Sequence, residues 1–296
     1  MNWINQLNAA IDYIEENLDG DISNQEITKI VNCSIYNFQR MFSYLADKSL
    51  SEYIRSRRLT RAALDIMNTD AKLIDIAMKY GYESQDSFTR AFKAFHGIVP
   101  SAIRNGAAVQ LKSYPKLSFK ITVEGENCMT YQIEKWPAFK VAGFKHRIKT
   151  EEAFKIVPEL WSQAWNSGTM NRFFDLLMKT DYRPAGILGI AIGGQGGNSI
   201  EMDYFMGVTN HVETDNVCHV PAPDGMEEIH IKSATWVIIQ ANGALPDAVQ
   251  KVYKQFYSEW LPGSNYQLDD LPILECYMQD NRQEVWVAVK DNKRTG

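Results

Sequence analysis

The chain contains no apolar run approaching the roughly 18 residues that a membrane-spanning helix needs. Residues 1–20 are acidic and amphipathic, and they have neither the basic start nor the apolar core of a secretory signal. The four cysteines are widely separated and form no CxxC pair, a spacing that favours neither a disulfide framework nor a zinc site. We therefore expect a cytoplasmic protein that has no membrane partner, no metal and no cofactor.

Basic residues are absent from residues 1–28, which hold six acidic side chains. Residues 29–104 carry 12 basic and 7 acidic side chains, a local net charge of +5 in a chain of net charge −5. A basic segment inside an acidic protein is an electrostatic feature of nucleic-acid binding, although an excess of this size is weak support by itself. At roughly 150 residues per domain, 296 residues predict two domains.

An internal repeat is the most specific feature of the amino-terminal half. The motif Ser34-x-x-x-Phe38-x-Arg40-x-Phe42 recurs fifty residues later as Ser84-x-x-x-Phe88-x-Arg90-x-Phe92. The residues before the two motifs include Asn32 and Gly81, which both tolerate positive φ, as a tight turn requires. Each copy therefore predicts a helix, a short turn and a serine-capped second helix, the organisation of a helix-turn-helix.

The two arginines of the repeat lie two positions beyond a core phenylalanine and so point about 200° away from it on a helix. Arg40 and Arg90 are therefore expected to face solvent or a partner, and arginine can make bidentate contacts to guanine. The same pattern also fits two αα-hairpins whose outer faces are simply polar. Between the copies, residues 51–68 predict a spacer helix whose arginines include candidates for internal ion pairs with Asp65 or Glu52.

Residues 7–106 resemble the DNA-binding domain of the AraC/XylS family of transcription regulators. The resemblance is strongest over Ile76-Ala77, Gly81-Tyr82, Ser87-Phe88, Arg90-Ala91-Phe92-Lys93, Gly97, Pro100-Ser101 and Arg104. It implies that the two capped helices enter successive major grooves of double-stranded DNA, about 34 Å apart. By the same resemblance, the residues that face the bases or the DNA backbone are Tyr36, Gln39, Arg40, Gln85 and Arg90. Asn37, Asp86 and Thr89 lie beside them on the same helix faces, and the expected phosphate contacts are Lys48, Arg55, Lys72, Lys93 and Arg104.

Asp86 departs from the uncharged residue expected at its position, and it could select a cytosine amino group or orient Arg90. Because the interpretation needs both arginines at an outer surface, burial of Arg40 and Arg90 within the fold would contradict it.

After residue 106 the pattern changes from helical to strand-like. A connection over residues 107–116 is followed by alternating residues from Leu117, and then by strands at 129–134, 139–148, 186–192 and 201–209 around a helix at 151–165. The order repeats with strands at 227–232, 234–241, 272–279 and 284–290 around a helix at 246–260. Two ββαββ units predict a pseudo-twofold α+β domain over residues 117–291, with both helices on the sheet and a cleft between the halves.

This second half resembles the GyrI-like effector-binding domain, also found in the Rob and BmrR regulators. The resemblance rests on residues 131–143, on Ser258-Glu-Trp-Leu-Pro-Gly-Ser, and on Pro272-Ile-Leu-Glu275-Cys-Tyr277. It implies that the glutamate at position 275 binds a ligand from the pocket floor. Alternation places Glu275 and Tyr277 opposite Leu274 and Cys276. Cation–π contact or stacking is expected from nearby aromatic residues, with Trp236, Tyr204 and Trp165 as candidates. Without the resemblance, a solvated glutamate beside a surface tyrosine would fit equally.

Together the two halves indicate an all-α double helix-turn-helix domain over residues 1–106 and a GyrI-like domain, hence a DNA-binding regulator that senses a small molecule and contacts RNA polymerase. No catalytic residue is expected, because no serine or cysteine has a recognisable base partner. The alternatives are hydrolysis of a reactive small molecule in the cleft by Glu275 and Tyr277, and a second domain that only docks other proteins.

Overall fold

The computed structural model describes residues 3–105, 110–120, 129–193, 201–214, 218–278 and 282–291. It divides into two compact units, one formed by residues 1–35 and 46–121 and the other by residues 36–45 and 122–296. No helix in the described ranges combines the length and the apolar character that crossing a bilayer requires.

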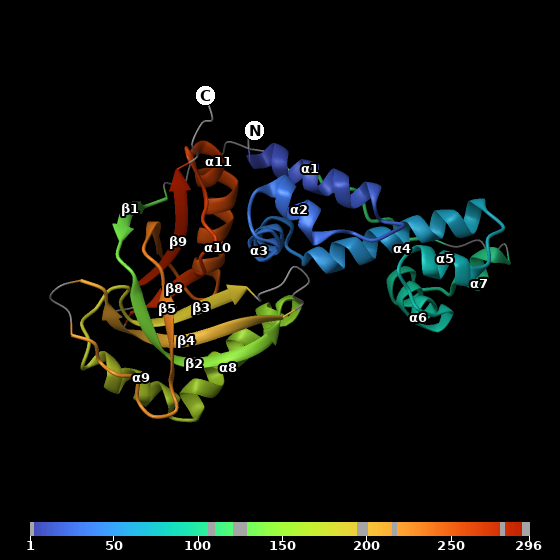
Figure 1. The fold of residues 1–296 in the computed structure, drawn as a ribbon. Coiled ribbons are helices and arrows are strands. Elements are labelled where there is room, and N and C mark those ends of the chain that lie inside the picture. The colour runs from blue at the N-terminus through green and yellow to red at the C-terminus, as the bar shows by residue number, and fades with distance from the viewer. Residues whose placement is uncertain are drawn as a thin grey trace. The chain divides into compact units, whose positions relative to one another are not determined.

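The first unit is helical (Figure 1). Its helices are α1 (Trp3–Glu16), α2 (Asn24–Val31), α4 (Leu50–Asn68), α5 (Leu73–Lys79), α6 (Gln85–His96) and α7 (Pro100–Arg104). Both predicted turns are confirmed, because Asn32 has φ 52° and Gly81 has φ 80°. The predicted serine cap is confirmed for α6, where Ser84 accepts a hydrogen bond from the Ser87 amide. Helix α2 has a serine cap as well, because Ser23 accepts a hydrogen bond from the Glu26 amide.

Helix α4 organises the rest of the unit, with α5, α6 and α7 gathered at its carboxyl-terminal end (Figure 1). The buried cluster there contains Leu59, Ala62, Ala63, Ile66, Ile76, Ala77, Tyr80, Phe88 and Phe92. The expected ion pairs of the α4 arginines differ from those found. Arg57 pairs with Glu15 of α1, with 2.7 Å between Arg57 Nη2 and Glu15 Oε2, whereas Asp65 pairs with Lys79 and Glu52 with Lys48.

The strand expected from Leu117 is not found among residues 117–120, and residues 121–123 lie outside the described part of the chain. Side chains of the helical unit bind the backbone of this segment instead. The Tyr53 hydroxyl accepts from the Leu117 amide, and Asn8 both accepts from the Phe119 amide at 2.8 Å and donates to the Phe119 carbonyl at 2.9 Å. Because these groups are already satisfied, the segment needs no partner strand.

The second unit contains helix α3 (Ile35–Ala46), of which residues 36–45 belong to it, and a nine-stranded antiparallel sheet. The strands are β1 (Tyr131–Trp136), β2 (Phe139–Lys149), β3 (Ile187–Gly193), β4 (Glu201–Val212), β5 (Glu227–Ile231), β6 (Ala234–Ala241), β7 (Tyr266–Leu268), β8 (Ile273–Tyr277) and β9 (Gln283–Asp291). The helical segments are η1 (Thr150–Glu152), α8 (Ala153–Asn166), α9 (Thr169–Leu177), α10 (Asp247–Gln255), the π-helical turn η2 (Phe256–Trp260) and α11 (Leu261–Gly263).

The strand order confirms the predicted twofold arrangement. It reads β1-β6-β9-β8-β3-β4-β2-β5, with β7 attached to β9. The equivalent strands of the two repeats are β1 and β5, β2 and β6, β3 and β8, and β4 and β9. Exchanging each strand for its equivalent gives the same order read backwards, so the approximate twofold axis passes between β3 and β8. Helix α9 and strand β7 are additions that the repeat did not predict.

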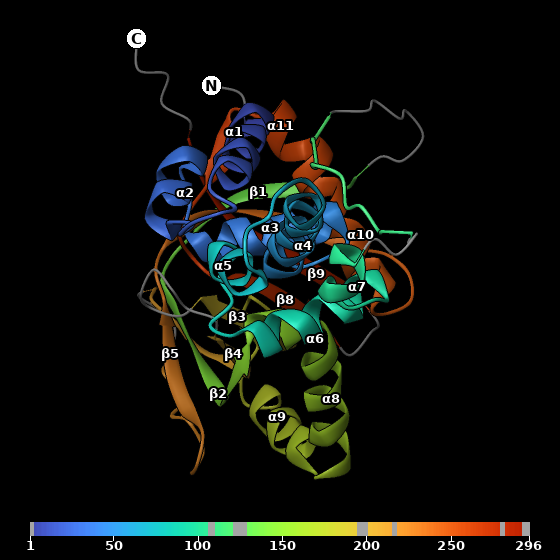
Figure 2. The same cartoon turned by 90° about the vertical axis from the view of Figure 1, so that its right-hand side faces the viewer.

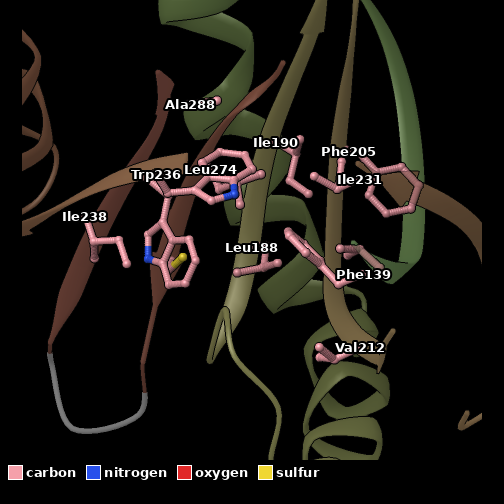
Figure 3. Packing of buried hydrophobic residues seen from close by; sticks show 13 residues of the cluster. Phe139, Leu188, Ile190, Phe205, Val212, Ile231, Trp236, Ile238, Leu274 and Ala288 are labelled. Atoms are coloured by element: carbon pink, nitrogen blue, oxygen red, sulfur yellow. The ribbon is translucent and has the colours of Figure 1, made fainter. Parts of the chain in front are cut away.

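Each face of the sheet has its own core. One face carries Phe139, Leu188, Trp236, Leu274 and Trp286 in a large buried cluster (Figure 3). On the other face, residues of α8 and α9 pack against β2, β3 and β4, and Figure 2 shows both helices beside this half of the sheet. Helix α10 packs on β6 and β9. Strands β3 and β8 therefore lie between α8 and α9 of the first repeat and α10 of the second repeat. The candidate site lies over these two strands.

Candidate functional site

A cavity of about 790 Å³ lies over β3 and β8, close to the approximate twofold axis. Its size is within the range of small-molecule sites, which are mostly apolar with a few converging polar groups. Helices α8 and α9 line it from the first repeat, residues 245–250 line it from the second, and α3 forms a further wall. The aromatic lining residues are Tyr36, Tyr44, Trp161, Trp165, Phe174, Tyr204 and Tyr277.

Glu275 enters this cavity because of its place in β8. Leu274 and Cys276 are fully buried in the cluster on the opposite face, so alternation turns Glu275 and Tyr277 toward the helices. Glu275 pairs in register with Gly189 of β3. A Cβ atom at Gly189 would lie 2.3 Å from the Tyr204 hydroxyl, so glycine at this position leaves the space in which Tyr204 reaches the cavity.

Two tyrosines hold the carboxylate of Glu275. The Tyr253 hydroxyl of α10 donates to Oε1 at 2.7 Å, and the Tyr277 hydroxyl donates to Oε2 at 2.8 Å. Burial raises the pKa of both tyrosines well above the usual value, and the charge of Glu275 raises it further. Both hydroxyls therefore remain donors at neutral pH, and they orient the carboxylate without neutralising its charge.

Arg40 of α3 occupies the position opposite this carboxylate. Its Nη2 donates to Glu275 Oε1 at 3.2 Å and also to the Tyr253 hydroxyl, and its Cζ lies 4.6 Å from the centroid of the Tyr253 ring. The Arg40 side chain is 10% exposed and that of Glu275 14%. Burial alone would lower the pKa of Arg40, but the surrounding tyrosines, led by Tyr253, and Glu275 raise it well above its usual value, so the arginine is charged.

Arg40 was expected to face solvent or a partner. Its side chain does point away from the core phenylalanines, but in this structure it lines a cavity and pairs with Glu275 instead of lying in solvent. Its counterpart Arg90 is exposed, so the condition that would contradict a DNA-reading role, burial of both arginines, is met for one of them only.

The remaining candidates for ligand contact divide between the two faces of the sheet. Tyr204 and Trp165 line the cavity, with Trp165 60% exposed at its rim. Trp236 does not, because its register in β6 turns it to the opposite face, where it is fully buried against Phe139 and Trp286. Trp161 was not predicted, although it lies one helical turn before Trp165; its Nε1 donates to the Tyr204 hydroxyl at 2.9 Å. Tyr253 was also missed.

The other predicted DNA-facing side chains differ between the two capped helices. In α3, Asn37 is buried and Gln39 is half-buried. In α6, Thr89 is half-buried and the rest of the predicted set is exposed, namely Gln85, Asp86, Arg90 and Lys93. Among the predicted phosphate contacts elsewhere, Arg55 and Lys72 are exposed, while Arg104 donates to the Ala71 carbonyl at 2.8 Å and Lys48 lies 4.1 Å from the Tyr114 ring centroid. No three His, Cys, Asp or Glu side chains in the described ranges are placed to hold a metal ion.

Comparison with known proteins gives separate matches for the two halves. Residues 129–290 match the GyrI-like small molecule binding domain, and residues 27–106 match a helix-turn-helix domain. The curated relatives align with the amino-terminal half. The transcriptional activator AarP of Providencia stuartii is 40% identical over 92 residues, which are 31% of this chain and 68% of AarP. The multiple antibiotic resistance protein MarA of Escherichia coli K12 is 33% identical over 98 residues, 33% of this chain and 77% of MarA.

The uncharacterized regulator YbfP of Bacillus subtilis strain 168 is 38% identical over 104 residues, which are 35% of each chain, so the match spans about a third of that relative. Among solved structures, SAV2435 bound to tetraphenylphosphonium is 22% identical with a TM-score of 0.45, and the match covers 55% of this chain and 94% of that one. The GyrI-like match covers more than half of the sequence. The chain combines a small-molecule-binding domain with a helix-turn-helix domain of the AraC type. It therefore belongs to the GyrI-like family.

Proposed function

We propose that the protein is a sequence-specific transcription regulator that acts on DNA in the cytoplasm, contacts RNA polymerase, and is controlled by an aromatic or otherwise lipophilic cation bound in the cavity of the second unit. The observation that carries the choice of ligand is the charge pattern of the cavity. Glu275 is the one carboxylate among the described lining residues, aromatic rings surround it, and a cation of the chain itself, the Arg40 guanidinium, already pairs with it.

A cation is the ligand that this arrangement favours. A carboxylate in a largely apolar cavity attracts a positive charge more strongly than it would in water, because the surroundings screen the charges less. Tyrosine and tryptophan faces add cation–π attraction and stack on flat apolar groups. The tyrosine hydroxyls already donate to both carboxylate oxygens, so a ligand need not supply a hydrogen-bond donor. A diffuse charge on a hydrophobic body is therefore sufficient.

Helix α6 supports the DNA-binding part of the proposal. It begins at the Ser84 cap and presents Gln85, Arg90 and Lys93 at its exposed surface. Glutamine and arginine can read adenine and guanine edges, and lysine neutralises phosphate. Phe88 and Phe92 anchor the opposite face of the helix in the core around α4, so the exposed face is held rigidly.

The cavity is proposed to bind its ligand rather than to hydrolyse it. Both oxygens of Glu275 accept hydrogen bonds from tyrosines, and burial keeps Tyr277 in its protonated form at neutral pH. In this pair Tyr277 is the hydrogen-bond donor and Glu275 is the acceptor. Turnover of an electrophilic substrate that is lost in Glu275→Gln would support the hydrolase alternative instead.

Ligand binding is tested with tetraphenylphosphonium, which has one positive charge and four phenyl rings, against triphenylphosphine oxide, which is aromatic and neutral. We expect calorimetric binding and thermal stabilisation of the full chain by the cation only. Glu275→Gln should weaken binding roughly 10- to 150-fold, since a hydrogen-bonded charge contributes about 1.5–3 kcal/mol. The exposed Glu259→Gln is the matched charge control and should bind normally. Equal binding of the two probes would contradict a cation site.

DNA binding is tested by selecting bound sequences from random duplexes at a stated salt concentration. Arg90→Ala should cost about 1–3 kcal/mol on the selected sequence if Arg90 reads a base. Enrichment of no sequence motif would contradict the regulator proposal.

A further inference from the structure

The first predicted reading helix is also a wall of the ligand cavity, and one arginine serves both roles. We propose that this arrangement is an autoinhibited state, in which Arg40 occupies the cation site as an intrachain substitute for the ligand and keeps α3 away from DNA. The inference rests on the proposed function and adds to it the mechanism and the sign of regulation: the cation displaces Arg40, releases α3 and so increases DNA affinity.

Several contacts hold α3 in place besides the ion pair with Glu275. The Tyr44 and Tyr253 rings stack with their centroids 4.3 Å apart. Tyr36 packs directly against Gly193 of β3, where a Cβ atom would lie 2.7 Å from the tyrosine side chain. Tyr36 also accepts a hydrogen bond from Arg40 Nη1 at 3.4 Å. The face of α3 that carries Tyr36, Arg40 and Tyr44 is therefore fitted to the cavity over two turns of helix.

The internal repeat shows that this fit is not a general property of such a helix. Tyr36, Arg40 and Tyr44 correspond to Asp86, Arg90 and Ala94 in the second copy. The arginine is common to both copies, as a DNA-reading role would require. The two tyrosines that line the cavity occur only in α3, and the corresponding residues Asp86 and Ala94 are exposed. The extra aromatic residues thus mark a function of α3 that α6 lacks.

Charge makes the two occupants of the site exclude one another. Arg40 and Glu275 form a nearly neutral pair, and no second carboxylate is found among the described residues that line the cavity. A cationic ligand beside Arg40 would face an uncompensated like charge in a poorly screened space. Arg40 likewise cannot contact Glu275 and a base at once. The ligand and DNA therefore both select the state in which Arg40 has left the cavity, and each must strengthen binding of the other by the same factor.

The ligand side is tested by calorimetry of full-length variants with tetraphenylphosphonium. Arg40→Ala removes the internal competitor, so we expect about 5- to 150-fold tighter binding, the usual range for coupled sites. Arg90→Ala removes the same side chain from the equivalent position of the repeat and should bind the cation like the parent protein. Equal affinity in the two variants would overturn the proposal, and this comparison needs no DNA.

The DNA side compares Glu275→Gln with Glu259→Gln, which change the net charge equally and leave every predicted DNA-facing residue intact. Without ligand, Glu275→Gln should bind the selected sequence about 5- to 150-fold more tightly than Glu259→Gln. Tetraphenylphosphonium should tighten DNA binding of Glu259→Gln and have little effect on Glu275→Gln. If both variants bind DNA equally, or if the cation weakens DNA binding, autoinhibition is refuted while the regulator proposal stands. If the parent protein shows neither sequence-specific DNA binding nor binding of the cation, the proposed function itself is refuted.

Discussion

Replacing Glu15 by alanine should destabilise the first unit much more than replacing an exposed acidic residue of the same unit. The carboxylate is 6% exposed and accepts three hydrogen bonds of 2.7 Å, from the Tyr53 hydroxyl, Arg57 Nε and Arg57 Nη2. Its removal leaves the Arg57 guanidinium charged in a site where the side chain is 12% exposed. Removing one partner of a buried ion pair typically costs about 3–5 kcal/mol, because the other charge stays desolvated.

The assay is hydrogen–deuterium exchange of α1 and α4 peptides, because unfolding of a chain with two units need not be two-state. A loss of 3 kcal/mol corresponds to roughly 150-fold faster exchange of amides that open with the unit. Glu26→Ala is the control, since the Glu26–Lys29 pair is also short, at 2.6 Å, but its side chains are 48% and 69% exposed. That pair should contribute at most about 1 kcal/mol. Equal effects of the two substitutions would refute the argument from burial.

The same carboxylate predicts a pH dependence with a definite sign. Burial raises the pKa of Glu15, but the hydrogen bonds from Arg57 and Tyr53 outweigh it and leave the pKa below the usual 4.5. A carboxyl group whose pKa is depressed by folding stabilises the protein above its unfolded pKa, and this contribution is lost as the pH falls through the folded value. Protection of α1 and α4 should therefore decline below about pH 4.5 in the parent protein. It should vary less in Glu15→Ala.

Three further substitutions test other parts of the structure. Gly189→Ala should displace Tyr204, break its hydrogen bond with Trp161 and abolish calorimetric binding of tetraphenylphosphonium, whereas Gly263→Ala, where a Cβ atom would meet nothing within 4 Å, should bind normally. Ser84→Ala should make the α6 amides exchange faster, by the equivalent of about 0.5–2 kcal/mol, because α6 loses its cap, and unchanged exchange would show that the cap is unimportant. Burial lowers the pKa of His96, so the stability of the first unit should fall as the pH drops below about 6.5, and His96→Gln should flatten that pH dependence in the exchange of α4 and α6 peptides.

The sequence predicted best those features that depend on neighbouring residues. Asn32 and Gly81 were placed in turns because few other residues tolerate positive φ, and both have it. The alternation in β8 predicted which side chains lie on opposite faces, as Leu274 and Glu275 do. Alternation alone does not say which face of a strand meets a helix, however. Trp236, which was expected to contact the ligand, lies in the core of the opposite face.

Arg40 shows the same limit at a longer range. Helical spacing correctly separated its side chain from the core phenylalanines of α3, and the repeat gave it the same position as Arg90. Its partner Glu275 is 235 residues away in the sequence, and no local pattern connects them. Each residue was nevertheless predicted to contact an external partner, Arg40 a DNA base and Glu275 a ligand in the pocket. The structure joins the two residues in a single ion pair, so under the proposed function this pair must break before Arg40 contacts DNA or Glu275 contacts a ligand.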